Sequence, residues 1–321
     1  MKKKVIVCLA MVLCILLVLG ACGGGGAQTT RLIMATGGTG GTYYPFGGVL
    51  AGVINANTDL QVTPNASGAS ADNLRQIAAG DAHVAFAQND VSYYAFTSTE
   101  IWSEFDAVTE LRALMALHPE PVQIVVFDNS GIYSVEDLAG RRVSIGDVGS
   151  GAAVNAVQIL NAHDLSLDDI DVFNLGAGPS ADAMREGSID AFFFTAIAPT
   201  AAIMELAARH DIRLLSIDDA RIDLLTQNYV FYARKVLTSE NYSFITEPVQ
   251  TVTVHAQLVV LESMDEQTAF EIVRAIMENK AAVIEGHRAG IYIEPEHSAR
   301  SVSVPLHPGA ERFFRELGVL G

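Results

Sequence analysis

A glycine-rich run between an apolar segment and a helical pattern constrains the fold of this chain more than any other feature. Leu32-Ile33-Met34 leads into Gly37-Gly38-Thr39-Gly40-Gly41-Thr42, and a helical pattern covers residues 44–55. A strand that passes through such a turn into a helix leaves free backbone N–H groups at the helix N-terminus, which favour a bound anion. A weaker copy follows later, where the strand-like 142–145 leads through Gly149-Ser150-Gly151 into a helical pattern at 153–162. Two such loops predict two lobes that hold one small ligand.

The first residues of the chain are typical of an export signal. Lys2-Lys3-Lys4 precedes the apolar stretch 5–19, which is shorter than the ~20 apolar residues of a membrane span. We therefore expect a signal peptide at 1–21. Leu19-Gly20-Ala21-Cys22 resembles a bacterial lipobox, which implies cleavage before Cys22, a lipid on its thiol and a flexible tether at 22–30. The alternative is an ordinary signal peptide with a chance cysteine.

The composition excludes several classes of function. The only cysteines are Cys8, Cys14 and Cys22, so the chain after the leader has no internal disulfide, cysteine nucleophile or thiolate metal site. A net charge of −17 disfavours nucleic acid and anionic membrane surfaces as partners. The eight histidines show no pair at metal-ligand spacing and are interpreted as surface or incidental residues. We therefore expect no metal and no cofactor.

The remaining chain alternates between strand and helix patterns, which indicates an α/β fold with a mostly parallel sheet covered by helices. Strands are expected at 31–35, 60–64, 84–87, 142–145, 171–175, 189–194 and near 213–217, and helices at 44–55, 70–79, 90–97, 153–162, 179–187, 199–210, near 219–227, 265–286 and 311–317.

Two segments are expected to cross between the lobes. The apolar segments 111–116 and 122–127 flank His118-Pro119-Glu120-Pro121, where the prolines are expected to break regular structure. The β-rich segment 251–261 is the expected return crossing. We therefore predict a first lobe from 31–119 and 252–321 and a second from 120–251, joined by a hinge where ligand sites commonly lie.

Several motifs in consistent order resemble the TAXI receptors, the solute-binding proteins of one branch of the tripartite ATP-independent periplasmic (TRAP) transporters. The motifs are Gly37-Gly38-Thr39-Gly40-Gly41-Thr42-Tyr43-Tyr44-Pro45, Ala85-Phe86-Ala87-Gln88-Asn89-Asp90, Asp137-Leu138-Ala139-Gly140-Arg141-Arg142-Val143-Ser144-Ile145-Gly146, Gly149-Ser150-Gly151, and Asp190-Ala191-Phe192-Phe193-Phe194-Thr195 through Pro199-Thr200. The resemblance covers essentially the whole chain after the leader. It implies a type II periplasmic-binding-protein fold that closes on a small organic acid or amino acid, such as glutamate or 2-oxoglutarate.

The same resemblance implies delivery of the ligand to a TRAP permease driven by an ion gradient. We accordingly expect an extracytoplasmic, lipid-anchored monomer, either in a periplasm or on the outer face of the cell membrane. Two departures bear on specificity. Ala152 stands where relatives often carry threonine, which removes a hydroxyl donor, and Ala196-Ile197-Ala198 replaces a frequent Gly-Gly pair, which predicts a tighter cleft wall.

The expected ligand contacts lie at strand ends and helix starts, where α/β sheets bind their ligands. They are Gly40, Gly41, Thr42, Tyr43, Tyr44, Gln88, Asn89, Gly149, Ser150, Gly151, Ala152, Thr195 and Thr200. Neither glycine loop contains a lysine or arginine, so neutral donors are expected to hold the ligand. Asn89 and Ser150 have an alternative role as helix caps, and the first loop has one as a tight turn.

An enzyme on the same fold is the main alternative of another class. Residue 148 is Val, so Ser150 lacks the Gly-x-Ser-x-Gly pattern, and the chain has no GxxxxGK[ST] loop and no GxGxxG. We therefore predict that the protein is not an enzyme. A receptor for an ATP-driven importer or a sensor shares the fold and stays open.

Overall fold

The computed structural model describes residues 30–321, so the predicted signal peptide, tether and Cys22 lie outside the described residues. Arg31–Gly321 forms one compact unit. Within the described part of the chain, no helix combines the length and apolar character needed to cross a membrane.

Helices and strands alternate along most of the chain. The strands are β1 (Thr30–Ala35), β2 (Leu60–Asn65), β3 (Val84–Gln88), β4 (Leu111–Phe127), β5 (Arg142–Ser144), β6 (Asp171–Phe173), β7 (Ala191–Thr195), β8 (Ile212–Leu214), β9 (Ala233–Leu237) and β10 (Val249–Leu261). The α-helices are α2 (Tyr43–Asn57), α3 (Ser70–Ala79), α4 (Asn89–Thr97), α5 (Gly151–Ala162), α6 (Ala177–Arg185), α7 (Ala201–Ala207), α8 (Asp219–Asn228), α9 (Glu266–Glu278), α10 (Lys280–Gly286), α11 (Pro295–Arg300) and α12 (Pro308–Glu316).

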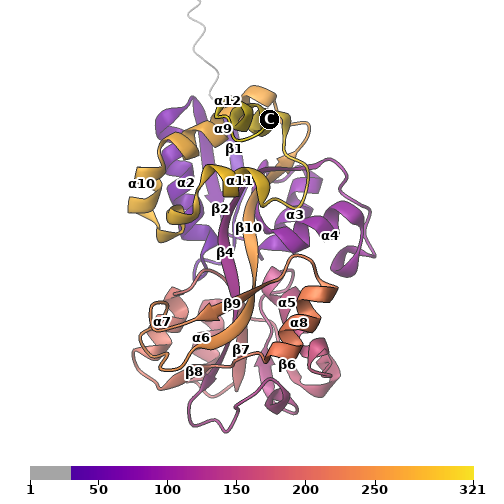
Figure 1. Cartoon of the computed structure of the whole chain (residues 1–321), viewed down its shortest axis with the longest axis vertical. Helices are drawn as coiled ribbons and strands as arrows, with labels where there is room; N and C mark the ends of the chain where they lie inside the picture. Colours follow the sequence, from indigo (N-terminus) through magenta and orange to yellow (C-terminus); the bar gives the residue numbers. More distant parts are fainter. Residues whose placement is uncertain (1–29) are drawn as a thin grey trace, which may run out of the picture. The chain divides into compact units, whose positions relative to one another are not determined.

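The strands form a sheet in the order β2-β1-β3-β10-β4-β7-β5-β6, with β8 on β4 and β9 on β10. Pairing is parallel between β1 and β3 and among β5, β6 and β7, whereas β4 and β10 run antiparallel to their neighbours. The expected mostly parallel sheet is therefore wrong for its centre. The long strands β4 and β10 extend through both groups of strands (Figure 1).

We call β1–β3 with α2–α4 and α9–α12 the first half, and β5–β8 with α5–α8 the second half. Strand β3 is buried along its whole length, with Phe86 in one core cluster and Ala85 and Ala87 in another. Alternate side chains point to opposite faces of a strand, so helices cover both faces of this sheet. The fold is α/β, with two lobes joined by two crossing strands. The residue boundaries predicted for the lobes stay a prediction.

The prolines of β4 do not break the strand, contrary to expectation. Strand β4 runs unbroken from Leu111 to Phe127. The carbonyl of Pro121 accepts a hydrogen bond from the N–H of Ala196, just past the end of β7. The N–H and C=O groups of successive residues point to opposite edges of a strand, so those of residues 119 and 121 point to the same edge. The missing proline N–H groups therefore face the sheet where β7 has ended, and no ladder bond is lost.

The single helix expected at 265–286 is also wrong. Asn279 separates α9 from α10 with backbone angles of φ −109° and ψ 29°, and its side chain donates to the carbonyl of Ala275. The apolar face of α9 includes buried Val273 and Ile276, but Ile284 in α10 is exposed. A local side-chain bond that competes with the helical ladder ends α9. Strand β9 and helix α11 have no counterpart in the sequence expectations.

Candidate ligand-binding site

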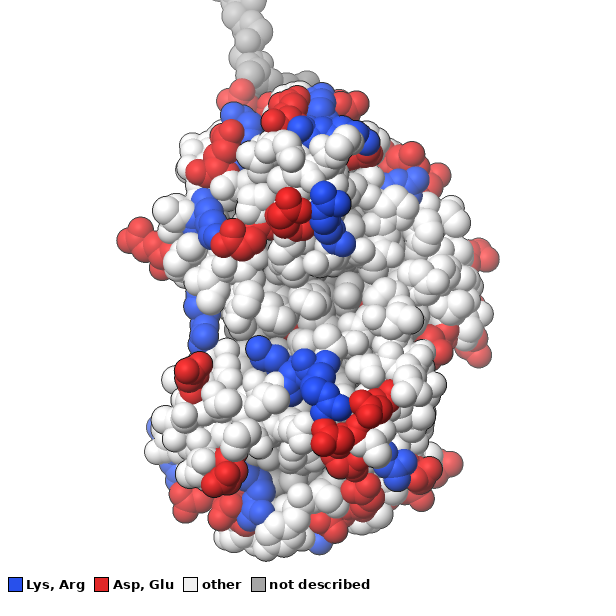
Figure 2. All heavy atoms as spheres, in the orientation of Figure 1, with Lys and Arg blue, Asp and Glu red and all other residues white. Residues whose placement is uncertain are grey.

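A cavity of about 200 Å³ lies between the two halves. Its wall comes from both glycine loops, the starts of α3 and α6, the end of β3, the middle of β4 and the end of β7. Figure 2 shows a hollowed, largely uncharged band between two ends rich in charged side chains. The volume is below the ~300–1,000 Å³ of pockets for drug-sized ligands, so a small ligand fits.

Five helices begin at this cavity, and the residue that precedes each helix lines it. These residues are Thr42 (before α2), Ala69 (before α3), Gln88 (before α4), Ser150 (before α5) and Gly176 (before α6). Of the five, only Ser150 caps its helix through a side chain, whose Oγ accepts a bond from Ala153 N at 3.1 Å. Each helix N-terminus carries a partial positive charge. At α3, α4 and α5 the first N–H groups are already bonded within the protein, at Ala71 and Asp72, Asp90 and Val91, and Ala153, so the open N–H groups lie at the starts of α2 and α6. The arrangement can therefore hold an anionic group without a lysine or arginine.

The charged side chains of the cavity wall are acidic. Glu120 and Asp147 line the cavity, and none of the described lining residues is a lysine or arginine. Burial raises the pKa of Asp147, and a hydrogen bond from the backbone of Gly176 partly opposes this rise. The cavity thus combines donors for an anion with carboxylates that would repel a second anion.

Tyr43 and Glu120 form a buried pair in the wall. The Tyr43 hydroxyl donates to Glu120 Oε2 at 2.7 Å, and the Tyr43 ring stacks on Phe86 at a centroid distance of 4.9 Å. Burial, with Glu120 beside it, raises the pKa of Tyr43 well above its usual value. His118 Nε2 lies 3.5 Å from the other oxygen of Glu120. The hydroxyl of Tyr43 is therefore occupied by Glu120 rather than free to bond a ligand.

Two buried polar atoms in the wall have no hydrogen-bond partner among residues 30–321. They are Gln88 Oε1 and Thr195 Oγ1. Gln88 lies directly over Gly151, where an added Cβ would fall 1.9 Å from Gln88 Oε1. Buried polar groups are normally paired. These two atoms are therefore available to a ligand that enters the cavity.

The structure brings most of the predicted site residues to one cavity. Those that line it are Gly40, Gly41, Thr42, Tyr43, Gln88, Ser150, Gly151, Ala152 and Thr195. Their contact with a ligand stays a prediction.

Four predicted residues, Tyr44, Asn89, Gly149 and Thr200, are not among the residues that line the cavity. Asn89 is the first residue of α4 rather than its cap, and its Oδ1 accepts bonds from the backbone of Asp90 and His255. The Gly149 carbonyl accepts from the start of α3, at Ala71 and Asp72. Thr200 Oγ1 donates to the carbonyl of Ile197, and half-buried Tyr44 lies one residue past the lining. Hydrogen bonds within the protein thus occupy the Asn89 side-chain oxygen, the Gly149 carbonyl and the Thr200 hydroxyl.

The sequence reasoning missed part of the wall. Asp147, Glu120 and the segment Gly176–Pro179 line the cavity, although none of them is among the expected ligand contacts. Gly176-Ala177-Gly178-Pro179 follows a strand and opens α6, so the pattern used for the two glycine loops could have found it. The sequence around Glu120 shows no such strand–glycine–helix pattern. The histidines were also misjudged, because His118, His163 and His307 are buried.

A profile of the NMT1-like family matches residues 34–318, nearly the whole described chain. The chain belongs to the NMT1-like family. This NMT1-like protein matches the alkanesulfonate-binding protein from Xanthomonas axonopodis pv. citri, bound to MOPS, at a TM-score of 0.51 and 19% identity, covering 90% of this chain and 85% of that one. It also matches a binding protein component of an ABC phosphonate transporter from Pseudomonas aeruginosa at a TM-score of 0.52 and 9% identity, covering 82% and 79%.

These likenesses confirm the expected fold of the NMT1-like protein, that of periplasmic solute-binding proteins. They do not test whether the chain is a TAXI receptor, which stays a prediction.

Proposed function

We propose that this NMT1-like protein is an extracytoplasmic solute receptor for a small zwitterion, an amino acid or a close analogue, and not an enzyme. The observation that carries the proposal is the pairing of five helix N-termini with two carboxylates around one cavity. The helix starts suit a carboxylate group of the ligand. Asp147 and Glu120 suit a protonated amine, whose positive charge would offset the desolvation that raises the pKa of Asp147.

This reasoning selects within the small organic acids and amino acids expected from the sequence. A dicarboxylate would bring two negative charges to a wall that holds Glu120 and Asp147 and no basic side chain among its described residues. A 2-oxo acid would bring its carboxylate without a positive group to pair with these two carboxylates. An amino acid brings one group of each sign. Gln88 Oε1 can accept from the amine, and Thr195 Oγ1 can bond either group.

The test is calorimetry and thermal shift on residues 30–321, which include the compact unit Arg31–Gly321. The ligand panel pairs each amino acid with its 2-oxo acid and with its decarboxylated amine. We expect the amino acid to raise the melting temperature, because it binds the folded state, and both partners to bind at least about tenfold more weakly. A 2-oxo acid that binds as tightly as its amino acid would overturn the zwitterion proposal.

Asp147→Asn tests the amine contact. We expect it to weaken amino-acid binding by about 1–3 kcal/mol, since a charged partner is lost. The matched control is Asp211→Asn in the same half, because Asp211 is exposed. Equal affinities in both variants would remove Asp147 from the amine site.

For delivery, we propose a membrane importer as partner and a lipid at Cys22 as anchor. The Pseudomonas aeruginosa neighbour is a component of an ABC transporter, which supports an ATP-driven importer more than the gradient-driven TRAP permease implied by the motifs. Uptake by membrane vesicles distinguishes the two. Loss of uptake with an inhibitor of ATP hydrolysis supports the importer, and loss with an ionophore supports the TRAP permease. Mass spectrometry of the membrane-bound protein, with Cys22→Ser as control, tests the lipid.

A further inference from the structure

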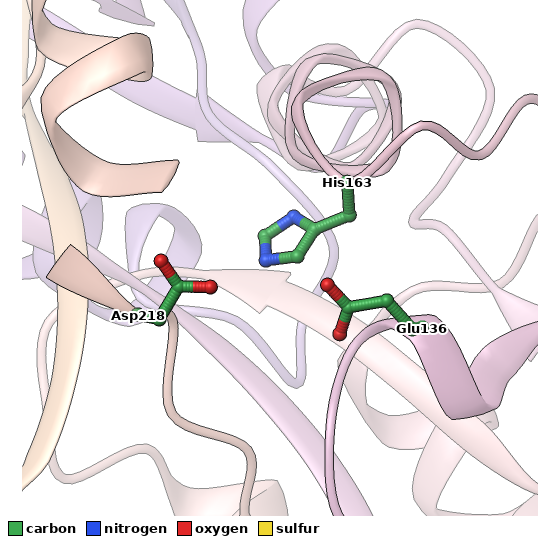
Figure 3. A group of neighbouring side chains, drawn as sticks. All are labelled: Glu136, His163 and Asp218. Carbon is green, nitrogen blue, oxygen red and sulfur yellow. The ribbon is translucent and has the colours of Figure 1, made fainter. Parts of the chain in front are cut away.

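Three side chains from separate elements of the second half converge at the end of α5. Glu136 lies in the short 3-10 helix Glu136–Leu138, His163 follows the last residue of α5, and Asp218 precedes α8. One possible ligand atom from each lies within 4.8 Å of the others. Figure 3 shows the imidazole between the two carboxylates. None of the three lines the ligand cavity, so this cluster is independent of the proposed function.

His163 is the buried member of the cluster, with a relative exposure of 3%. Its Nδ1 lies 2.8 Å from the carbonyl oxygen of Ile159. That bond requires a proton on Nδ1, so the neutral ring carries its lone pair on Nε2. Within residues 30–321, Nε2 makes no hydrogen bond and no ion pair with either carboxylate. A histidine held through Nδ1–H by a backbone carbonyl, with Nε2 free, has the arrangement found in metal-binding histidines.

The two carboxylates have free oxygens and are exposed. Glu136 makes no side-chain hydrogen bond within the described chain, and Asp218 uses Oδ1 to accept from the Arg221 N–H at 3.0 Å. The guanidinium of Arg221 is the nearby positive charge, and it is paired with Asp164 at 2.9 Å. The Arg221 guanidinium also donates to the Ala162 carbonyl at the C-terminal end of α5, so it already meets part of the negative charge of that helix end.

We propose that Glu136, His163 and Asp218 bind one divalent transition-metal ion, for which Zn²⁺ is the best match. An imidazole ligand favours Zn²⁺ over Mg²⁺ or Ca²⁺, which take oxygen ligands. Metal–ligand bonds of about 2.0–2.2 Å require ligand atoms about 3.3 Å apart in a tetrahedral site. The exposed Glu136 and Asp218 side chains can close the remaining gap of up to about 1.5 Å by rotation, and water completes the coordination.

A bound ion would tie the helix of Glu136, the end of α5 and the start of α8 together. Helix α5 starts at the cavity and ends at this cluster, over a length of about 18 Å at 1.5 Å per residue. The ion would therefore stabilise the second half at the far end of a helix whose first turn faces the ligand. The bound ion itself would not contact the ligand in the cavity.

The test is calorimetric titration of Zn²⁺ into untagged residues 30–321 that have been stripped with a chelator, without any organic ligand. We expect binding of a single equivalent and a rise in melting temperature that the chelator reverses. Glu136→Gln and Asp218→Asn remove one ligand each while keeping shape and exposure. Each should weaken Zn²⁺ binding by roughly tenfold or more, and the double variant should abolish the single-equivalent step.

Glu205→Gln and His210→Ala are matched controls from the same half, and both should bind Zn²⁺ like the unchanged protein. Since Glu136 is exposed, Glu136→Gln keeps the test informative even if a change at buried His163 unfolds the chain. The proposal is wrong if the unchanged protein shows no single-equivalent binding. It is equally wrong if the double variant binds Zn²⁺ with unchanged affinity.

Discussion

The two glycine loops share a pattern but meet the cavity in different ways. The first loop ends at Thr42, whose side chain makes no cap bond, so the N–H groups at the start of α2 remain open to a ligand. The second loop contains Gly146 and Gly149 at φ +113° and +79°, and Ser150 caps α5. The first loop is therefore built as a set of free donors. In the second loop, the Ser150 side chain already accepts a bond from Ala153 N, so this N–H group is not open to a ligand.

The largest effect is expected at the second loop. Gly151→Ala would place a Cβ 1.9 Å from Gln88 Oε1, so the buried Gln88 side chain must leave its position. We expect a loss of about 1–3 kcal/mol in the free energy of unfolding and a loss of ligand binding. In the first loop, a Cβ on Gly41 would meet its nearest atom at 3.4 Å, so Gly41→Ala should cost much less. Urea unfolding and calorimetry measure both, and equal effects would remove the contrast between the loops.

A second prediction concerns the contact between the halves behind the cavity. Asp90 in α4 accepts from Asn155 in α5 at 2.9 Å, and burial raises the pKa of Asp90 to about 7. In the unfolded chain this pKa is about 3.9. Between these values the folded protein holds a proton that the unfolded chain has lost, so the free energy of unfolding falls as pH rises.

Asp90→Asn should remove this part of the pH dependence while keeping the contact with α5. Chemical unfolding between about pH 4 and about pH 8 measures it. Asp81→Asn, at an exposed site of the same half, is the control and should keep the slope. An unchanged slope in Asp90→Asn would show that Asp90 does not hold the proton.

The smallest effect separates the caps of the two loops. Ser150→Ala removes the cap of α5 and should lower the free energy of unfolding by about 1 kcal/mol. Thr42→Ala removes no cap bond and should lower it less than Ser150→Ala does. Thermal or urea unfolding of both variants measures the difference. Stability losses of equal size would contradict the assignment of Ser150 as the only side-chain cap of the five helices.

The sequence predicted local structure well where one segment carries its own signal. The helix expected at 70–79 is α3 residue for residue, and the strand at 84–87 is β3 but for its last residue. The prediction failed where tertiary contacts decide the outcome. Pro119 and Pro121 stay within β4 because of where β7 ends, and neither position shows this in the sequence.

The sequence by itself determined the alternation of strands and helices and the two glycine turns that open α2 and α5. These features depend on hydrogen bonds, glycine conformations and apolar periodicity within a few residues of one another. The tertiary structure alone decided that five helices begin at one cavity, that Glu120 and Asp147 face it, and that Glu136, His163 and Asp218 meet. Those groups are far apart in the chain. The packing of the two halves brings the cavity groups together, and packing within the second half brings Glu136, His163 and Asp218 together.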